Sequence, residues 1–201
     1  MSVALSQYNL AVLYASGGGG LAKDEREAAR LYKLAADQGD PAAQTDLGAF
    51  YDAGRGGLPR DEREAARLFG LAAGQGDPVA QFDLGVFYAN GRAGLATDER
   101  EAARLYRLAA DQGSAEAQFN LANFYLKGRA GLPQDEREAL RLYRLAADQG
   151  DPDAQANLGV FYQRGLGGLA KDEREAARLF QLAAKHGNET AQRNLARLGN
   201  R

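Results

Sequence analysis

A charged segment, Asp-Glu-Arg-Glu, occurs five times in this sequence and contains the residue types that acid–base chemistry uses. Its copies begin at Asp24, Asp61, Asp98, Asp135 and Asp172. A catalytic acid–base pair needs two carboxylates in different environments around a cleft, whereas this segment is the same each time. In the first turn of a helix, the same carboxylates meet unpaired N–H groups and the positive end of the helix dipole. The sequence therefore favours helix capping over catalysis for this segment.

Two arginines in and after this segment predict ion pairs. Arg63 and Arg67 lie four residues apart on the outer face of one predicted helix, and both recur in the other copies. We expect them to form a lattice of ion pairs with the acidic residues of neighbouring copies. Exposed pairs of this kind are each worth about 0–1 kcal/mol, so such a lattice would add little stability.

The remaining residues that could do chemistry are glycine-rich loops and one histidine. The loops at 17–23 and 54–60 could cradle a phosphate, but neither matches a Walker or dinucleotide fingerprint and neither follows a predicted strand. Their glycines are better explained by turns with positive φ. His186 replaces a glutamine found in the other four copies, and the chain has no cysteine. We therefore expect no catalytic residue, no metal site and no cofactor.

The overall charge argues against two classes of partner. The 201 residues include 25 Lys and Arg against 27 Asp and Glu, a formal net charge of −2. No global field would concentrate the chain on nucleic acid or on anionic lipid. The N-terminus lacks the basic region of a secretion signal, and no run approaches the roughly 18 apolar residues of a membrane span. We expect a folded cytoplasmic protein that binds no nucleic acid and does not insert into membranes, although a trimmed chain would look the same.

The five segment starts differ by 37 residues each time, so the chain is a tandem repeat without insertions. Each copy predicts two helices. In the second copy, the first helix is capped at Asp40 and stops at Gly54. The second helix starts at Asp61, with Glu64 three residues on completing an Asp-x-x-Glu capping box, and Gly76 suits the left-handed position after its end.

Both helices run about 13 residues and are too short to be stable alone in water, so stacking of neighbouring copies must stabilise them. The predicted fold is an all-α solenoid of antiparallel helix pairs with a 37-residue period. We expect a single domain over residues 1–201, with repeats at 4–40, 41–77, 78–114, 115–151 and 152–188 and a C-terminal capping helix at 189–201.

The repeat carries a recognisable pattern. Leu-Gly-x-Phe-Tyr is followed by a Gly-rich loop, an acidic helix start and Ala-Ala-Arg-Leu-Tyr, with small residues such as Gly48, Ala65, Ala72 and Ala73 at the expected helix crossings. This pattern resembles the Sel1-like repeat (SLR) family, relatives of the tetratricopeptide repeats, over essentially the whole chain. The resemblance implies a right-handed solenoid and a scaffold or adaptor role through protein–protein contacts, without shared catalytic chemistry.

The first helices of the copies differ from one another on one side only. On a helical wheel at 100° per residue, the variable positions fall between about 180° and 280° from Ala43, away from the near-invariant positions. These variable positions are those of Ala42, Thr45, Ala49, Asp52 and Ala53. The family resemblance places this side inside the concave groove of the solenoid.

This variable side predicts a groove for a protein or peptide partner, because such grooves combine aromatic anchors with polar groups. The candidate residues are Tyr8, Thr45, Asp46, Val79, Phe82, Asp83, Val86, Phe119, Asn120, Asn123 and Asn157. Adjacent helices pack at roughly 8–10 Å, so Phe82 and Phe119 are expected to be neighbours. The alternative is that the rings pack against neighbouring helices and that the Asn and Asp side chains only brace them.

Three functional hypotheses remain open. The leading one is a non-enzymatic adaptor that holds a partner protein or an extended peptide in its groove. The second is a consensus-like, engineered or recently duplicated scaffold without an evolved ligand, which the near-identity of the copies favours. A reader of single-stranded RNA is the third, but it needs a basic groove and the polar positions here are partly acidic. The sequence leaves open whether the solenoid ends pair into homodimers.

Overall fold

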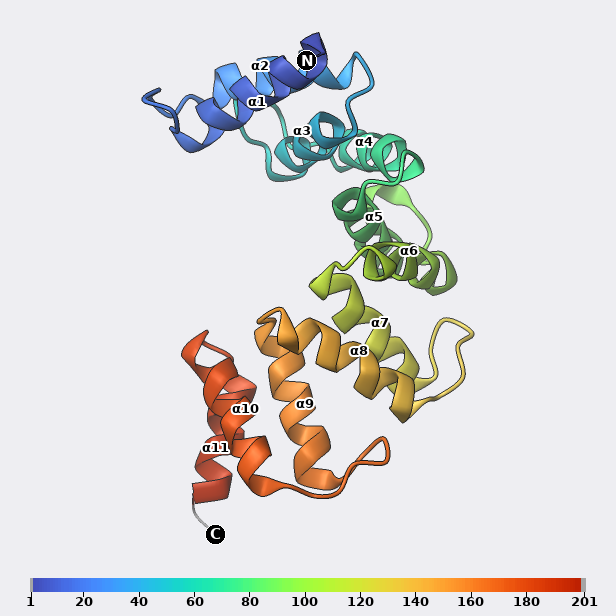
Figure 1. Ribbon diagram of the computed structural model, residues 1–201. Helices are drawn as coiled ribbons and strands as arrows, with labels where there is room; N and C mark the ends of the chain where they lie inside the picture. The colour runs from blue at the N-terminus through green and yellow to red at the C-terminus, as the bar shows by residue number, and fades with distance from the viewer. Residues whose placement is uncertain (1, 200–201) are drawn as a thin grey trace. The chain divides into compact units, whose positions relative to one another are not determined.

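The computed structural model describes residues 2–199, and this range folds into eleven α-helices and one short 3₁₀ helix (Figure 1). The helices are α1 (Val3–Ser16), α2 (Glu25–Ala36), α3 (Pro41–Ala53), α4 (Glu62–Gly74), α5 (Pro78–Asn90), η1 (Arg92–Gly94), α6 (Glu99–Asp111), α7 (Ala115–Lys127), α8 (Glu136–Asp148), α9 (Pro152–Arg164), α10 (Glu173–Lys185) and α11 (Glu189–Gly199). We call the odd-numbered helices first helices and the even-numbered ones second helices. The predicted all-α fold of paired helices is confirmed. Residues 200 and 201 of the predicted capping helix lie outside the described range.

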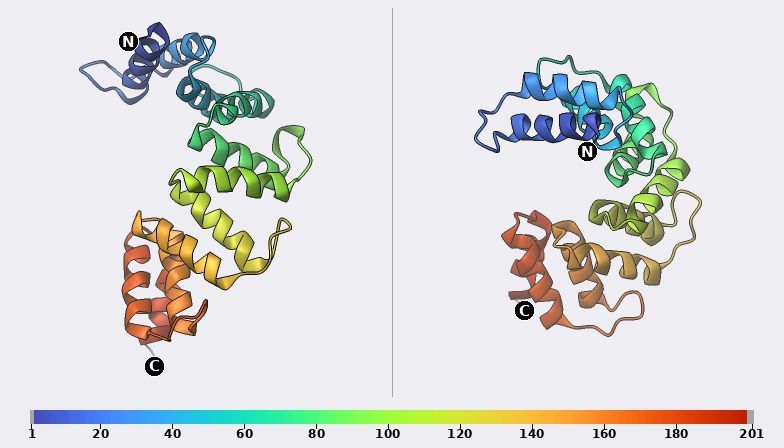
Figure 2. Two further views of the ribbon diagram at one scale, coloured as in Figure 1. Left: turned by 45° about the vertical axis from the view of Figure 1, so that its right-hand side comes forward. Right: turned by 45° about the horizontal axis from the view of Figure 1, so that its top comes forward.

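The chain divides into two compact units, the first up to Leu108 and the second from Ala109. In the first unit α1 packs on α2, α2 on α3, α3 on α4 and α4 on α5; in the second, α7 to α11 pack in the same successive way. Both views of Figure 2 show α10 beside α9 and α11. Within the described residues, no helix has both the length and the apolar character that crossing a membrane requires. The single domain and the right-handed course of the solenoid stay predictions.

The Asp-Glu-Arg-Glu segments begin the second helices, as expected. In each copy the Asp carboxylate accepts hydrogen bonds from backbone N–H groups two or three residues on, over 2.9–3.1 Å. The predicted start and stop of the first helix are confirmed as well, since Asp40 caps α3 and Gly54 ends it with a φ of 65°. Gly76, after α4, has a φ of 93°.

The predicted capping box is wrong in one half. The backbone N–H of Asp61 donates to the carbonyl oxygen of Tyr51 at 2.9 Å, so it is not available to Glu64. The Glu64 carboxylate instead binds Arg67 through two hydrogen bonds of 2.7 and 2.8 Å. The end of the preceding first helix thus takes the place of the side chain that would close the box.

The predicted ion-pair lattice is also wrong in its partners. Arg67 pairs with Glu64 of its own helix, and Arg63 makes no ion pair with another described residue. Contacts between copies come from the loops, where Arg55 reaches Glu25 at 2.7 Å. In the same way Arg92 reaches Glu62 at 2.9 Å. The hydrogen bond from Arg55 lowers the pKa of Glu25 to about 2. The second residue of the segment therefore links one copy to the loop of the next.

Small residues let the two helices of a copy approach closely. A Cβ added to Gly48 would lie 2.8 Å from a ring carbon of Phe69, and one added to Gly159 would lie 2.6 Å from Phe180. Ala65, on the facing second helix, is fully buried. In these two copies, a glycine of the first helix thus lies against an aromatic ring of the second.

Candidate partner-binding face and basic pocket

The candidate residues all lie on first helices, and we call their side the first-helix face. In the first unit, α1 contributes Tyr8, α3 contributes Thr45 and Asp46, and α5 contributes Val79, Phe82, Asp83 and Val86. In the second unit, α7 contributes Phe119, Asn120 and Asn123, and α9 contributes Asn157. Exposure separates them: Val79 is 55% exposed, Thr45 is only 4% exposed, and the others are half-buried. Because Phe82 and Phe119 belong to different units, their predicted proximity stays a prediction.

Three aromatic side chains of the first-helix face pack against tyrosines of the second helices. The ring centroids are 5.9 Å apart for Tyr8 and Tyr32, 5.8 Å for Phe82 and Tyr106, and 6.0 Å for Phe119 and Tyr143. One side of each ring therefore fills the space between the two helices of a copy, as the alternative interpretation held. Since each ring is only half-buried, part of its surface remains on the outside.

Two copies have a small residue instead of an aromatic one at this position, and the second-helix residue that faces it also differs. Thr45 and Ala156 occupy it there, and the facing second-helix residues are Phe69 and Phe180 instead of tyrosine. The hydroxyl of Thr45 lies 3.0 Å from the Pro41 carbonyl oxygen and 3.1 Å from the Asp77 carboxylate, so it helps to hold the start of α5. The paired change between the two columns is present in the sequence and would have revealed this packing.

Asp46 is half-buried between helices, where its carboxylate lies near the hydroxyls of Tyr8 and Tyr32. Burial raises its pKa, and hydrogen bonding by the hydroxyls of Tyr32 and Tyr8 opposes that rise in part. Burial, followed by the Asp46 carboxylate, raises the pKa of Tyr8 to about 12. Both tyrosines therefore keep their protons at neutral pH and can donate to Asp46.

Two asparagines of the second unit also contact a tyrosine of a second helix. The hydroxyl of Tyr143 donates to Oδ1 of Asn123 at 2.8 Å, and Asn123 donates through Nδ2 to the Phe119 carbonyl oxygen at 3.1 Å. Burial raises the pKa of Tyr143 to about 12, and hydrogen bonding by the side chain of Asn157 opposes that rise in part. These contacts agree with the alternative that polar residues of this face brace neighbouring helices. The surface left for a partner includes Val79, the half-buried Val86 and Asn120, and the outer sides of the rings.

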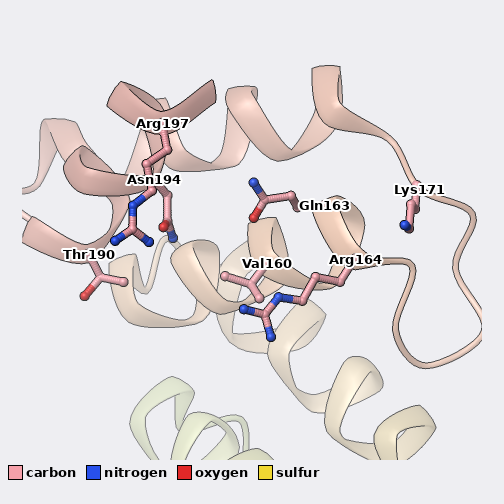
Figure 3. Close-up of a pocket in the computed structure, with 7 residues that line it drawn as sticks. All are labelled: Val160, Gln163, Arg164, Lys171, Thr190, Asn194 and Arg197. Carbon is pink, nitrogen blue, oxygen red and sulfur yellow. The ribbon is translucent and has the colours of Figure 1, made fainter. Parts of the chain in front are cut away.

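A pocket of about 710 Å³ lies in the second unit, between α9 and α11. We call it the basic pocket. Figure 3 shows its lining, which is Val160, Gln163 and Arg164 of α9, Lys171 of the following loop, and Thr190, Asn194 and Arg197 of α11. The lining contains no acidic residue. Within residues 2–199, no ion pair joins an acidic residue to any of its three cationic side chains.

The basic pocket belongs to the first-helix face. At the 37-residue spacing, Arg197 aligns with Val160 and Asn123, and Asn194 aligns with Asn157. None of the residues that line the pocket is among the candidates chosen from the sequence, where the last helix was interpreted as a cap. The available signal was the arginine at 197, because the equivalent positions of the other copies are uncharged.

The acidic segments do not form a site of their own. Their Asp side chains cap helices, and their last Glu side chains bind arginines three residues on over 2.6–2.7 Å. In the part of the chain that the structure describes, no cluster of three or more Asp, Glu and His side chains could hold a metal ion. The smaller pockets of about 510 and 420 Å³ on the second helices are lined in part by these paired Glu and Arg side chains, and the candidate binding features are the first-helix face and its basic pocket.

The helix pairs, their 37-residue period and the bracing between copies define a helical repeat protein. The model of the Sel1 repeat matches residues 4–40, 41–77, 78–114, 115–151 and 152–188. The chain therefore belongs to the Sel1 repeat family.

Solved structures show the same fold. The Sel1 repeat protein from Oxalobacter formigenes has a TM-score of 0.84 and 31% identity, over 96% of this chain and 74% of that one. The protective antigen c5321 from uropathogenic Escherichia coli has a TM-score of 0.57 and 28% identity, over 96% of this chain and 48% of that one. Immunity protein Pa5087 from Pseudomonas aeruginosa has a TM-score of 0.57 and 23% identity, over 90% and 68%. No curated protein matches the chain significantly.

Proposed function

We propose that this Sel1 repeat protein is a non-catalytic scaffold that binds a partner protein or an extended peptide on its first-helix face. The observation that carries the proposal is the contrast between the two kinds of helix. Second helices are nearly identical from copy to copy and are held by caps and internal ion pairs. First helices vary on one face, where Val79 is 55% exposed and three aromatic rings are partly exposed.

Partly exposed apolar and aromatic groups beside polar ones are typical of protein-binding surfaces. The rings of Phe82 and Phe119 are pre-positioned by Tyr106 and Tyr143, which lowers the entropy that binding would cost. Near-invariant residues on the other side of each first helix, such as Ala43, Leu47 and Phe50 of α3, are buried in the core that joins neighbouring copies. This division of labour allows one backbone to present a specific surface.

Photo-crosslinking tests which side of the chain meets a partner. p-Benzoylphenylalanine is placed at Val79 on the first-helix face and, as a matched control, at Leu71 on a second helix of the same unit, which is 46% exposed. Both full-length proteins are irradiated in a lysate of the source organism. We expect a discrete crosslinked protein from position 79 and not from position 71. Crosslinking from 71 alone would refute the assignment of the face.

The second candidate is a repeat scaffold without an evolved ligand, which the near-identity of the second helices favours. It predicts no protein-specific crosslink from either position. Repeating the experiment at Val86, further along α5, separates an inert scaffold from a single badly placed probe. A partner that crosslinks from both 79 and 86 excludes this candidate.

A further inference from the structure

We propose that the basic pocket binds an acidic segment of a protein partner, with carboxylates against Arg164 and Arg197 and an apolar side chain against Val160. This inference rests on the proposed function and names the chemistry of the partner. It concerns only the second unit, where α9, the following loop and α11 supply the whole lining (Figure 3).

The charges of the pocket distinguish it from the rest of the unit. Arg141 and Arg178 of the second helices each bind a glutamate three residues away, at 2.6 Å. Arg164, Lys171 and Arg197 instead share one concavity that no acidic residue lines. Asp153 of α9 accepts a hydrogen bond from Asn188 at 2.6 Å and stays outside the lining. Cations that share one cavity repel one another, and a bound anion would relieve that repulsion.

The uncharged part of the lining suits a peptide. Gln163 and Asn194 can each donate to and accept from a peptide backbone, and the hydroxyl of Thr190 can do the same. Val160 offers an apolar contact beside Arg164. The volume of about 710 Å³ lies within the range of roughly 300–1,000 Å³ found for ligand pockets. The pocket can therefore take a few side chains together with their backbone.

Nucleic acid suits this lining less well. Single strands are held by aromatic rings on which bases stack, in addition to a basic groove, and the lining contains no aromatic residue. Two arginines with planar forks match paired carboxylates well. These features favour an acidic protein segment.

Fluorescence anisotropy with a labelled octapeptide of alternating Glu and Val tests the inference on the full chain at low salt. The test variant is Arg164→Gln/Arg197→Gln. The matched control is Lys127→Gln/Arg174→Gln, which removes the same charge from exposed positions outside the pocket, and position 127 is the repeat equivalent of 164. We expect binding at least about tenfold weaker in the test variant and changed less than about twofold in the control.

Equal weakening in both variants, or none in the test variant, would overturn the assignment, as would no binding by the unchanged chain. Tighter binding of a twelve-residue oligothymidine, or of the same peptide with phosphoserine in place of Glu, would also overturn it. Circular dichroism confirms that both variants stay folded. The proposed function fails separately, if position 79 in the first unit crosslinks no partner, so the two failures are distinguishable.

Discussion

At the scale of single residues, the same tyrosine position lies beside a carboxylate in one copy and beside a neutral amide in another. Tyr32 lies beside Asp46 in the first unit, and its repeat equivalent Tyr143 lies beside Asn157 in the second. Asn157 brings no negative charge into this half-buried place, and the hydroxyl of Tyr143 has Asn123 as its acceptor. Asp46 is therefore the less favourable of the two solutions at neutral pH.

Replacing Asp46 with Asn is expected to raise the melting temperature, and more so at higher pH. Burial raises the folded-state pKa of Asp46, so the folded chain holds this proton more tightly than the unfolded chain does. This acid group then costs stability as pH rises above its unfolded pKa, and the full cost is present above its folded pKa. Thermal unfolding of Asp46→Asn and the parent from pH 4 to pH 8 measures the difference.

The reverse substitution, Asn157→Asp, is the control and is expected to lower the melting temperature more at pH 8 than at pH 4. An advantage of Asp46→Asn that shrank as pH rose would contradict the burial argument. It would mean that the hydrogen bonds from the two tyrosines outweigh the cost of burial.

At the scale of helices, the residues of the acidic segment have three different roles: one caps the helix, one pairs within the helix, and one contacts the next copy. Asp61 holds two backbone N–H groups at the start of α4, Glu64 binds Arg67, and Glu62 reaches Arg92 in the loop of the next copy. The first task is local to one turn of helix. The last depends on how a later copy is placed.

Asp61→Ala is expected to cost about 1–2 kcal/mol of unfolding free energy, because two N–H groups lose their acceptor. Glu64→Ala removes only an exposed pair and is expected to cost no more than about 0.5 kcal/mol. Urea unfolding followed by circular dichroism measures both. Equal costs would show that the segment stabilises the helix mainly through its ion pair.

Contacts within one turn of helix could be predicted from the sequence, whereas contacts between distant residues could not. The caps at Asp40 and Asp61 and the stops at Gly54 and Gly76 depend on residues within one turn, and they were predicted correctly. The pair between Arg92 and Glu62 was missed because these residues are 30 positions apart and meet only through the loop geometry.

The site was predicted less completely, for the same reason. The 37-residue repeat period and the helical wheel identified the first-helix face. They could not show that Thr45 is buried against the start of α5 or that Asn123 accepts a hydrogen bond from Tyr143. The basic pocket needs α9 and α11 side by side before Arg164 and Arg197 become neighbours of one cavity. The sequence shows that position 197 carries an arginine where the other copies are uncharged, but it does not show that Arg164 lines the same cavity.

At the scale of the whole molecule, a helix at the end of the described chain has fewer main contacts than a helix inside it. The main helix contact of α11 is with α10, whereas α9 has main contacts with both α8 and α10. Stability in such repeats is roughly a sum of helix and neighbour contributions, so ends open more easily.

Hydrogen exchange measured by mass spectrometry is expected to show faster exchange in α11 than in α9 by at least about tenfold, since α11 has one main helix interface to break instead of two. Peptides from α8 provide an internal reference, because α8 also packs on two helices. Equal protection of α11 and α9 would indicate that the second unit opens only as a whole.

The central claim is that recognition belongs to the first helices, and the affinity of the crosslinked partner tests it most directly. Calorimetric Kd values are compared for Phe82→Ala/Phe119→Ala and for Leu71→Ala/Leu145→Ala, the latter changing exposed leucines of second helices in the same two units. We predict at least about tenfold weaker binding for the first pair and less than about twofold change for the second. Unchanged affinity in a folded Phe82→Ala/Phe119→Ala variant, or a larger loss in the leucine pair, would contradict the claim.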